Sequence, residues 1–147
     1  MRPVAFPYIP YHGHPAPIVP IHIRGPRGWT SVWVYVDSGA SISILNTARE
    51  AGRLGVRTED GQLVYSVVGD GSLIPVYVHR LLIRIGPIEL MAVIGFSSRL
   101  GVGFNLLGRQ DVFHRFDITF SDSRQRVLFK PPRSPRNSSR ISSLIDH

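Results

Sequence analysis

The stretch Ser31-Val32-Trp33-Val34-Tyr35-Val36-Asp37-Ser38-Gly39-Ala40-Ser41 runs from strand-forming apolar residues straight into an acid, a hydroxyl and a glycine. Val, Trp and Tyr favour a pleated backbone, and the unbroken apolar run predicts a strand that is buried on both faces. A carboxylate at the end of such a strand costs free energy to bury unless it is hydrogen-bonded or has a function. Asp37 is therefore the residue whose role needs an explanation.

Length and composition predict one globular domain. The chain has 147 residues, 43% of them apolar, which is enough for a core that needs no covalent staples. It contains no cysteine, so disulfides and cysteine-ligated metal sites are excluded. No apolar run is long enough for a membrane-spanning helix, and residues 1–7 lack the apolar core of a signal peptide. We therefore expect a cytoplasmic protein without a membrane partner.

The formal net charge of +7 raises the question of nucleic acid as a partner. The basic residues, all arginines except Lys130, are scattered along the chain. They cluster only in residues 130–136 and at Arg140, in a Ser/Pro-rich segment that we expect to be a solvated tail. A β-domain that binds nucleic acid would carry aromatics interleaved with cations on one sheet face, whereas only isolated pairs such as Tyr77 and His79 occur. We expect no nucleic-acid partner.

The chain divides into three regions. Residues 1–17 are rich in proline, which favours an extended arm or a loop over a strand in the middle of a sheet. Residues 18–130 hold the regular structure, and residues 131–147 have the composition of a disordered tail. His12 and His14 have no acid or third histidine close by in the sequence. We therefore expect exposed loop histidines rather than a metal site, and no cofactor.

Within residues 18–130 the apolar pattern predicts short strands separated by turns. The expected strands cover residues 18–24, 29–36, 62–68, 72–85, 88–94, 104–108, 116–120 and 127–129, and an apolar run continues over 42–45. A short helix is expected over residues 46–52, beginning at Asn46 or Thr47 and ending near Gly52, with a further helical turn within 109–114. So many strands with so little helix predict an all-β domain with barrel-like closure.

The hairpin of residues 62–85 turns at Gly69-Asp70-Gly71, because Asp-Gly between strand-forming runs is a strong turn signal. In its second arm Ile74, Val76 and Val78 share one face, whereas Leu81, Ile83 and Ile85 share the other. A two-residue period cannot change phase without a bulge or a bend. We therefore expect one near His79-Arg80.

Asp37-Ser38-Gly39 is the tripeptide of aspartic proteases, and its surroundings add to the signal. An apolar strand precedes it, Ala40-Ser41 follows, a glycine-tipped hairpin comes next, and Leu106-Leu107-Gly108-Arg109 then opens a short helical segment. This order resembles the retropepsin-like proteases, which are the retroviral proteases and their cellular and bacterial relatives. The resemblance covers residues 18–129, and residues 104–120 are particularly similar to the bacterial members.

The resemblance implies a closed-barrel aspartic-protease fold with a flap hairpin, and the activity of an aspartic endopeptidase. The site residues that it implies are Asp37 as the catalytic acid, Ser38, Gly39 and Ala40 as support of the catalytic loop, Val68, Gly69, Asp70 and Gly71 as the flap, and Leu106, Leu107 and Gly108 as the pocket floor. The Ser38 hydroxyl would hold two copies of the loop together. The lack of a side chain at Gly39 would let a substrate backbone approach closely.

One catalytic acid is not enough for this chemistry. Hydrolysis of a peptide bond by an activated water needs one ionised carboxylate and one protonated carboxyl, and two carboxyls about 3 Å apart share one proton. Asp37 is followed by Ser-Gly, and no other aspartate of the chain is followed by Ser or Thr and then Gly. The second carboxyl must come from another chain. We expect a homodimer with both Asp37 residues at its two-fold axis, acting on polypeptides.

Two features leave alternatives open. Ser41 stands where retroviral members commonly have an aspartate that pairs with the arginine corresponding to Arg109, so the partner of Arg109 is undetermined and the cellular and bacterial branch is favoured. Asp37 taken alone is also an ordinary turn-capping acid. The alternative to an endopeptidase is the same fold without activity, used as a dimerising or peptide-binding module.

Overall fold

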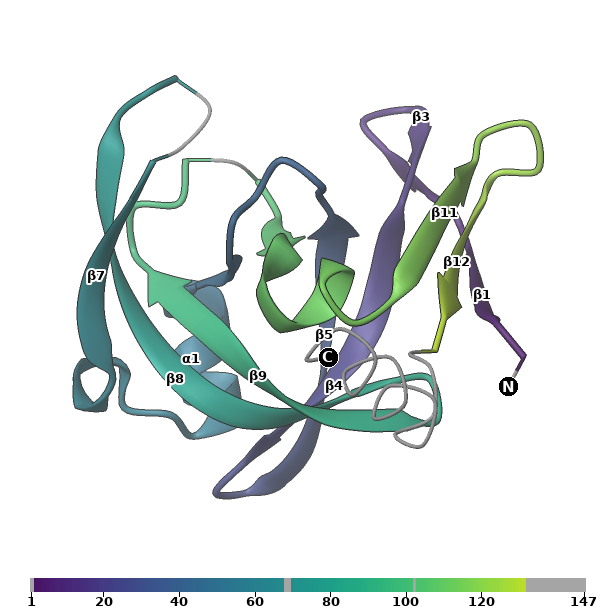
Figure 1. Cartoon of the computed structure of the whole chain (residues 1–147). Coiled ribbons are helices and arrows are strands. Elements are labelled where there is room, and N and C mark those ends of the chain that lie inside the picture. The colour runs from purple at the N-terminus through teal and green to yellow at the C-terminus, as the bar shows by residue number, and fades with distance from the viewer. Residues whose placement is uncertain (1, 68–69, 102, 132–147) are drawn as a thin grey trace, which may run out of the picture.

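The computed structural model describes residues 2–67, 70–101 and 103–131, and the chain is drawn in Figure 1. Its strands are β1 (Val4–Pro7), β2 (Ile9–Tyr11), β3 (His14–Ala16), β4 (Ile18–Gly25), β5 (Gly28–Val36), β6 (Ser43–Asn46), β7 (Gln62–Val67), β8 (Leu73–Ile85), β9 (Ile88–Ser97), β10 (Asn105–Leu107), β11 (Asp117–Ser121) and β12 (Arg126–Lys130). The helical segments between them are α1 (Thr47–Leu54), η1 (Thr58–Asp60) and η2 (Arg109–Phe113). The prediction of an all-β domain is confirmed. Across these described ranges, no helix has the length and apolar character that crossing a membrane requires.

A ring of strands forms the centre of the fold. The seven-stranded sheet has the order β4-β5-β10-β6-β9-β8-β7, and β4 also pairs with β8, so the sheet closes on itself. Within it, β10 runs parallel to β5, and β6 runs parallel to β9. Parallel neighbours need crossover connections, and here the crossover brings β10 alongside the end of β5. The predicted barrel-like closure is confirmed, and Asp37 follows directly at the end of β5.

The curvature of the long strand β8 explains why the apolar residues in its sequence change from one face to the other. Its register with β9 is continuous from Tyr77 to Ile85, so this ladder contains no bulge. Instead, the two faces of β8 contact two apolar clusters. Ile74 and Val76 pack in a small cluster beneath the β7–β8 hairpin, whereas Ile83 belongs to the main core inside the barrel. Figure 1 shows β8 curving strongly between these two places. A bend is therefore present where the sequence allowed either a bulge or a bend.

The expectation that the apolar run of β5 is buried on both faces is wrong. Val32, Val34 and Val36 are buried in the main core, but Trp33 on the opposite face is 52% exposed. Strands of a closed barrel present alternate residues inward and outward, so an unbroken apolar run still has one outward face. Here the outward positions hold the two large aromatics, Trp33 and Tyr35.

Helix α1 begins where the sequence predicted and ends later. The Asn46 side chain accepts a hydrogen bond from the Arg49 backbone N–H at 3.1 Å, which confirms Asn46 as the N-cap. The helix continues through Gly52 and ends at Gly55, whose φ of 73° lies in the left-handed region that glycine adopts without strain. The expected end near Gly52 is therefore wrong. The burial of Leu54 in the main core supports the additional residues.

The proline-rich N-terminal residues form paired strands. β1 pairs with β12 and occupies the edge of a three-stranded sheet of order β1-β12-β11, where a proline such as Pro7 removes no central ladder bond. β2 and β3 form a separate two-stranded hairpin. The Tyr8 hydroxyl donates to Asp122 Oδ1 at 2.8 Å and fastens this segment to the β11–β12 turn. The predicted disorder of the C-terminal tail falls on residues that, apart from Pro131, lie outside the described part of the chain.

Segment η2 is less regular than the helical turn that the sequence predicted. Gln110 has an extended backbone, with ψ at 129°, and Asp111 has a left-handed φ of 65°, which Asp tolerates better than most residues. The Asp111 carboxylate accepts a hydrogen bond from the Val93 backbone N–H at 2.8 Å. Asp111 therefore ties η2 to β9.

Candidate active site

A groove of about 1090 Å³ lies between the β7–β8 hairpin and the loop that follows β5. Its lining residues are Asp37, Gly39, Ala40, Ser41, Ile42, Ile44, Val64, Tyr65, Ser66, Val67, Asp70, Leu100, Gly101, Phe104 and Leu106. Most of them are apolar, and several belong to the small apolar cluster beneath the hairpin. The groove therefore combines a largely apolar wall with the carboxylate of Asp37, a combination typical of ligand sites.

Asp37 is held by backbone groups on both sides. Its own N–H donates to the Leu107 carbonyl at 3.0 Å, which continues the parallel pairing of β5 with β10 past the end of the strand. Its Oδ1 accepts a hydrogen bond from the Gly39 N–H at 2.9 Å, and its carbonyl accepts one from the Ala40 N–H at 3.2 Å. The loop is thus a tight turn that fixes the carboxylate at the groove.

The segment after β10 supports the same loop from below. Arg109 N–H donates to the Ala40 carbonyl at 2.9 Å, and Gln110 N–H donates to the Ser41 carbonyl at 3.0 Å. Gly108 N–H donates to Ser43 Oγ at 2.9 Å. A Cβ at Gly108 would overlap the Ile42 carbonyl oxygen, so this close approach requires glycine.

The predicted floor residues lie together but have different surroundings. Leu106 lines the groove and belongs to the rim of the small apolar cluster. Leu107 is fully buried in the main core, and Gly108 is buried beneath the loop that carries Asp37. Only Leu106 of the three contacts the groove itself, whereas Leu107 and Gly108 hold the loop that carries Asp37.

A buried polar cluster beneath β5 was not foreseen from the sequence. The Glu50 side chain is 3% exposed, pairs with Arg53 at 2.5 Å and accepts a hydrogen bond from Asn105 Nδ2 at 2.7 Å. Asn105 Nδ2 also donates to the Trp33 carbonyl at 2.9 Å, and Asn105 Oδ1 accepts from the Asn46 N–H at 2.8 Å. Asn105 therefore joins β5, β10 and α1. The sequence signal was an asparagine inside the apolar run of β10.

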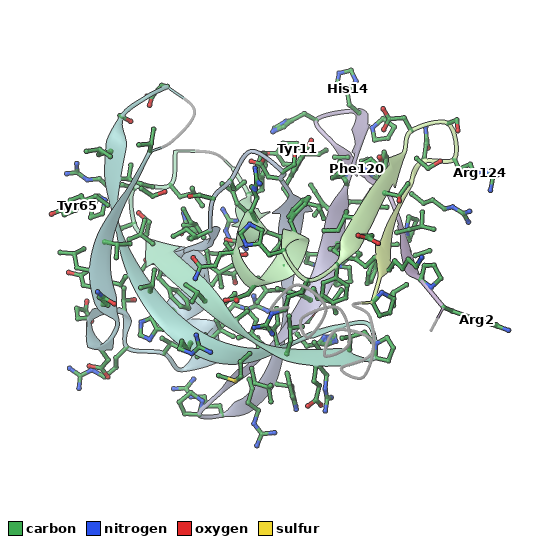
Figure 2. The ribbon with its side chains drawn as sticks, in the orientation of Figure 1. Arg2, Tyr11, His14, Tyr65, Phe120 and Arg124 are labelled. Atoms are coloured by element: carbon green, nitrogen blue, oxygen red, sulfur yellow. The ribbon has the colours of Figure 1, made fainter. Side chains whose placement is uncertain are left out.

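The hairpin that the resemblance identifies as a flap borders the groove. Val64, Tyr65, Ser66, Val67 and Asp70 line it, whereas the predicted flap residues Val68 and Gly69 lie outside the described residues. The outward face of the hairpin is unusually apolar, with Leu63, Tyr65, Val67 and Leu73 between 44% and 66% exposed. Figure 2 shows Tyr65 projecting from the outer side of this hairpin.

The base of the hairpin turn is ordered by Asp70. Its Oδ1 accepts hydrogen bonds from the Ser72 hydroxyl at 2.6 Å and from the Ser72 N–H at 2.9 Å. These bonds, the hydroxyl first, hold the pKa of Asp70 below its ordinary value of 3.8. Gly71 between them has a φ of 85°. The ionised form of Asp70 thus keeps the turn closed.

The remaining predicted residues lie at the surface of the site. Ser38 is exposed beside Asp37, and Ser41 is exposed on the groove wall. Arg109 is exposed too, and among the residues that the structure describes its guanidinium makes no ion pair. Two carboxylates line the groove among the described residues: Asp37 on the loop after β5, and Asp70, whose Oδ1 is bonded to Ser72 in the hairpin turn.

No protein-family model and no curated protein matches the sequence. Among solved structures, the chain is similar to a retropepsin-like aspartic protease from Rickettsia conorii. That likeness has a TM-score of 0.61 and 16% identity, and covers 87% of this chain and 98% of the other. It is also similar to EIAV protease solved with an inhibitor. There the TM-score is 0.50 and the identity 21%, covering 69% of this chain and 88% of the other.

In both comparisons the similar part covers most of the solved chain, but the sequence identity is low, so what the comparisons show is a shared fold. The closed-barrel fold that the sequence resemblance implied is therefore confirmed. The chain has the fold of the retropepsin-like aspartic proteases.

Proposed function

We propose that this protein is an aspartic endopeptidase. The observation that carries the proposal is the place of Asp37. Its carboxylate lines the largely apolar groove, on a loop whose backbone is tied to β10 and to the segment after it. A plain turn-capping acid would satisfy its own loop but would not need a groove of this size in front of it.

The reaction needs a second carboxyl, which a second copy of the chain would supply. In a two-fold dimer the two Asp37 carboxyls would share one proton. The ionised carboxylate takes a proton from water, whose oxygen bonds to the scissile carbonyl carbon, while the protonated carboxyl gives its proton to the carbonyl oxygen. Proton transfer to the amide nitrogen then allows the C–N bond to break, releasing a carboxylic acid and an amine.

The β7–β8 hairpin would act as the flap over a bound peptide. It borders the groove opposite Asp37, and its strand β7 is an edge strand whose outer side pairs with no other strand among the described residues. An extended peptide can pair with such an edge through backbone hydrogen bonds while its side chains enter the apolar groove. Closure would also exclude water from the reacting bond.

The test is a digest of a peptide library by the full chain, read by mass spectrometry, comparing wild type with Asp37→Asn. Asparagine keeps an oxygen for the Gly39 N–H, so the loop should be retained while cleavage falls by at least about 10³-fold. Asp117→Asn, at an exposed position on β11, is the matched control and should cleave as wild type does.

Two results would count against the proposal. Cleavage by Asp37→Asn at the wild-type rate would show that the activity comes from elsewhere. Peptide binding by wild type without any cleavage, at acidic as well as neutral pH, would favour the alternative of a silent peptide-binding module.

A folding control accompanies the digest. A thermal unfolding midpoint for Asp37→Asn within about 4 °C of wild type would show that the fold is kept.

A further inference from the structure

The hairpin β2–β3 near the N-terminus touches a residue that lines the groove. The ring of Tyr11, at the end of β2, meets the ring of Phe104 edge to face, with centroids 5.1 Å apart. Phe104 lines the groove, whereas Tyr11 does not. Tyr11 therefore touches the groove wall through Phe104. In Figure 2 Tyr11 lies on the side of this hairpin that faces the rest of the molecule, and His14 points away from it.

Phe104 contacts two aromatic rings. Besides Tyr11, it stacks on Tyr35 of β5, with centroids 4.7 Å apart and planes inclined by 26°. Aromatic pairs of this geometry contribute about 0.5–1.5 kcal/mol beyond the area that they bury. Tyr35 is close in sequence to Asp37, so the three rings connect the N-terminal hairpin, the groove wall and the strand that carries the acid.

A second contact places Tyr11 against the same wall. A Cβ at Gly103 would overlap the Tyr11 hydroxyl, and among the described residues the atoms that it would meet within 4 Å all belong to Tyr11. The backbone at Gly103 and the ring of Phe104 are thus both shaped by one side chain. Gly101, which also lines the groove, has no such neighbour within that distance.

We propose that Tyr11 is a positioning residue for the substrate groove. It holds Phe104 and the backbone at Gly103 in the shape that receives an apolar side chain of the peptide. This inference rests on the proposed endopeptidase function. It assigns a role to the β2–β3 hairpin, which takes no part in the proposed catalytic chemistry. Loss of the ring would let Phe104 turn and would weaken binding of the peptide more than the chemical step.

The test is a double-mutant cycle measured with a peptide that wild type cleaves. Tyr11→Ala should raise KM by about 2- to 10-fold, with a smaller change in kcat, as expected for the loss of one aromatic pair. Gly103→Ala should raise KM as well, because its methyl group meets the Tyr11 hydroxyl. In the Tyr11→Phe background, which lacks that oxygen, Gly103→Ala should have little effect. His14→Ala, an exposed change on the same hairpin, is the control and should leave KM unchanged.

The outcomes separate this inference from the proposed function. Suppose that wild type and His14→Ala both cleave the peptide. The positioning role is then wrong, and the endopeptidase proposal stands, if Tyr11→Ala has the KM of wild type or if the effects of Tyr11→Phe and Gly103→Ala on KM are simply additive. If wild type cleaves nothing, the endopeptidase proposal fails. Amide hydrogen exchange at Gly103 and Phe104 then measures the same contact without catalysis. Faster exchange in Tyr11→Ala supports the positioning role, and unchanged exchange overturns it.

Discussion

Backbone groups around Asp37 bind its carboxylate and hold its loop in place. The Gly39 N–H binds one carboxylate oxygen, while the backbone of Ala40 and Ser41 is held by the residues after β10. A loop held in this way costs little reorganisation when a charged or protonated carboxyl is needed. The same turn in a surface loop without the β10 contacts would leave the acid free to rotate into solvent.

Asn105 does not line the groove, but its loss should cost considerable stability. Asn105→Ala removes one of the two partners of the Glu50 carboxylate, together with the side-chain partner of the Asn46 N–H and of the Trp33 carbonyl, and should lower the free energy of unfolding by about 3 kcal/mol. Urea unfolding followed by circular dichroism measures the loss. Glu89→Ala, which breaks an ion pair with Arg84 whose side chains are 42% and 45% exposed, should cost less than about 1 kcal/mol. Equal losses for the two variants would contradict the role given to Asn105.

The lowered pKa of Asp70 predicts how the hairpin turn responds to pH. Its pKa is lowered by the bonds from Ser72, so its contribution to the turn is present above pH 3.8 and is lost as the pH falls through the lowered pKa. The Ser72 amide resonance should therefore titrate with a midpoint below 3.8. In Ser72→Ala, which loses the hydroxyl bond, the midpoint should rise. A midpoint that is the same in both proteins would contradict this assignment. The base of the hairpin should thus stay ordered at the mildly acidic pH where a carboxyl pair keeps its proton.

At the level of the elements, the close contact between the end of β10 and the Asp37 loop depends on glycine. Gly108→Ala places a methyl group against the Ile42 carbonyl and about 2.9 Å from the Ala40 carbonyl oxygen, atoms that cannot move away without disturbing the loop. We expect a loss of about 2–3 kcal/mol in stability and a parallel loss of cleavage. Gly52→Ala in α1 meets nothing within 4 Å and should instead stabilise the protein by about 0.5–1 kcal/mol. Thermal unfolding measures both, and an unchanged Gly108→Ala protein would refute the close approach.

Elements with a clear local signal could be predicted from the sequence. The Asn46 cap, the turn at Asp70-Gly71 and the alternation of β8 each depend on neighbouring residues. The burial of β5 could not be predicted fully, because ring closure decides which face of an apolar run points outward. The pairing of β1 with β12 joins the two ends of the described chain, and no local pattern contains that information.

The candidate site, too, could be predicted from the sequence only in part. Asp37 and its loop could be located because the tripeptide and the apolar strand are adjacent in sequence. The groove wall could not, because Phe104 and the hairpin β7–β8 meet Asp37 only after the barrel closes. The link from Asn105 to Glu50, and that from Tyr11 to Phe104, join residues far apart in the chain and carry no periodic signal.

For the molecule as a whole, we propose that one chain holds half of an active site. The Asp37 loop offers one carboxylate, whereas the proposed chemistry needs two carboxyls. This proposal predicts that activity depends on protein concentration, since a dimer must form before the site exists. It also predicts that one defective chain disables the wild-type chain with which it pairs.

Mixing the two forms tests this claim most directly. Wild type and Asp37→Asn are unfolded together in equal amounts, refolded, and assayed for peptide cleavage at the total concentration used for wild type alone. If both carboxyls of a dimer are needed, random pairing leaves about one quarter of the wild-type activity, because only pairs of two wild-type chains are active. Activity of about one half would mean that each chain works alone, and it would contradict the account.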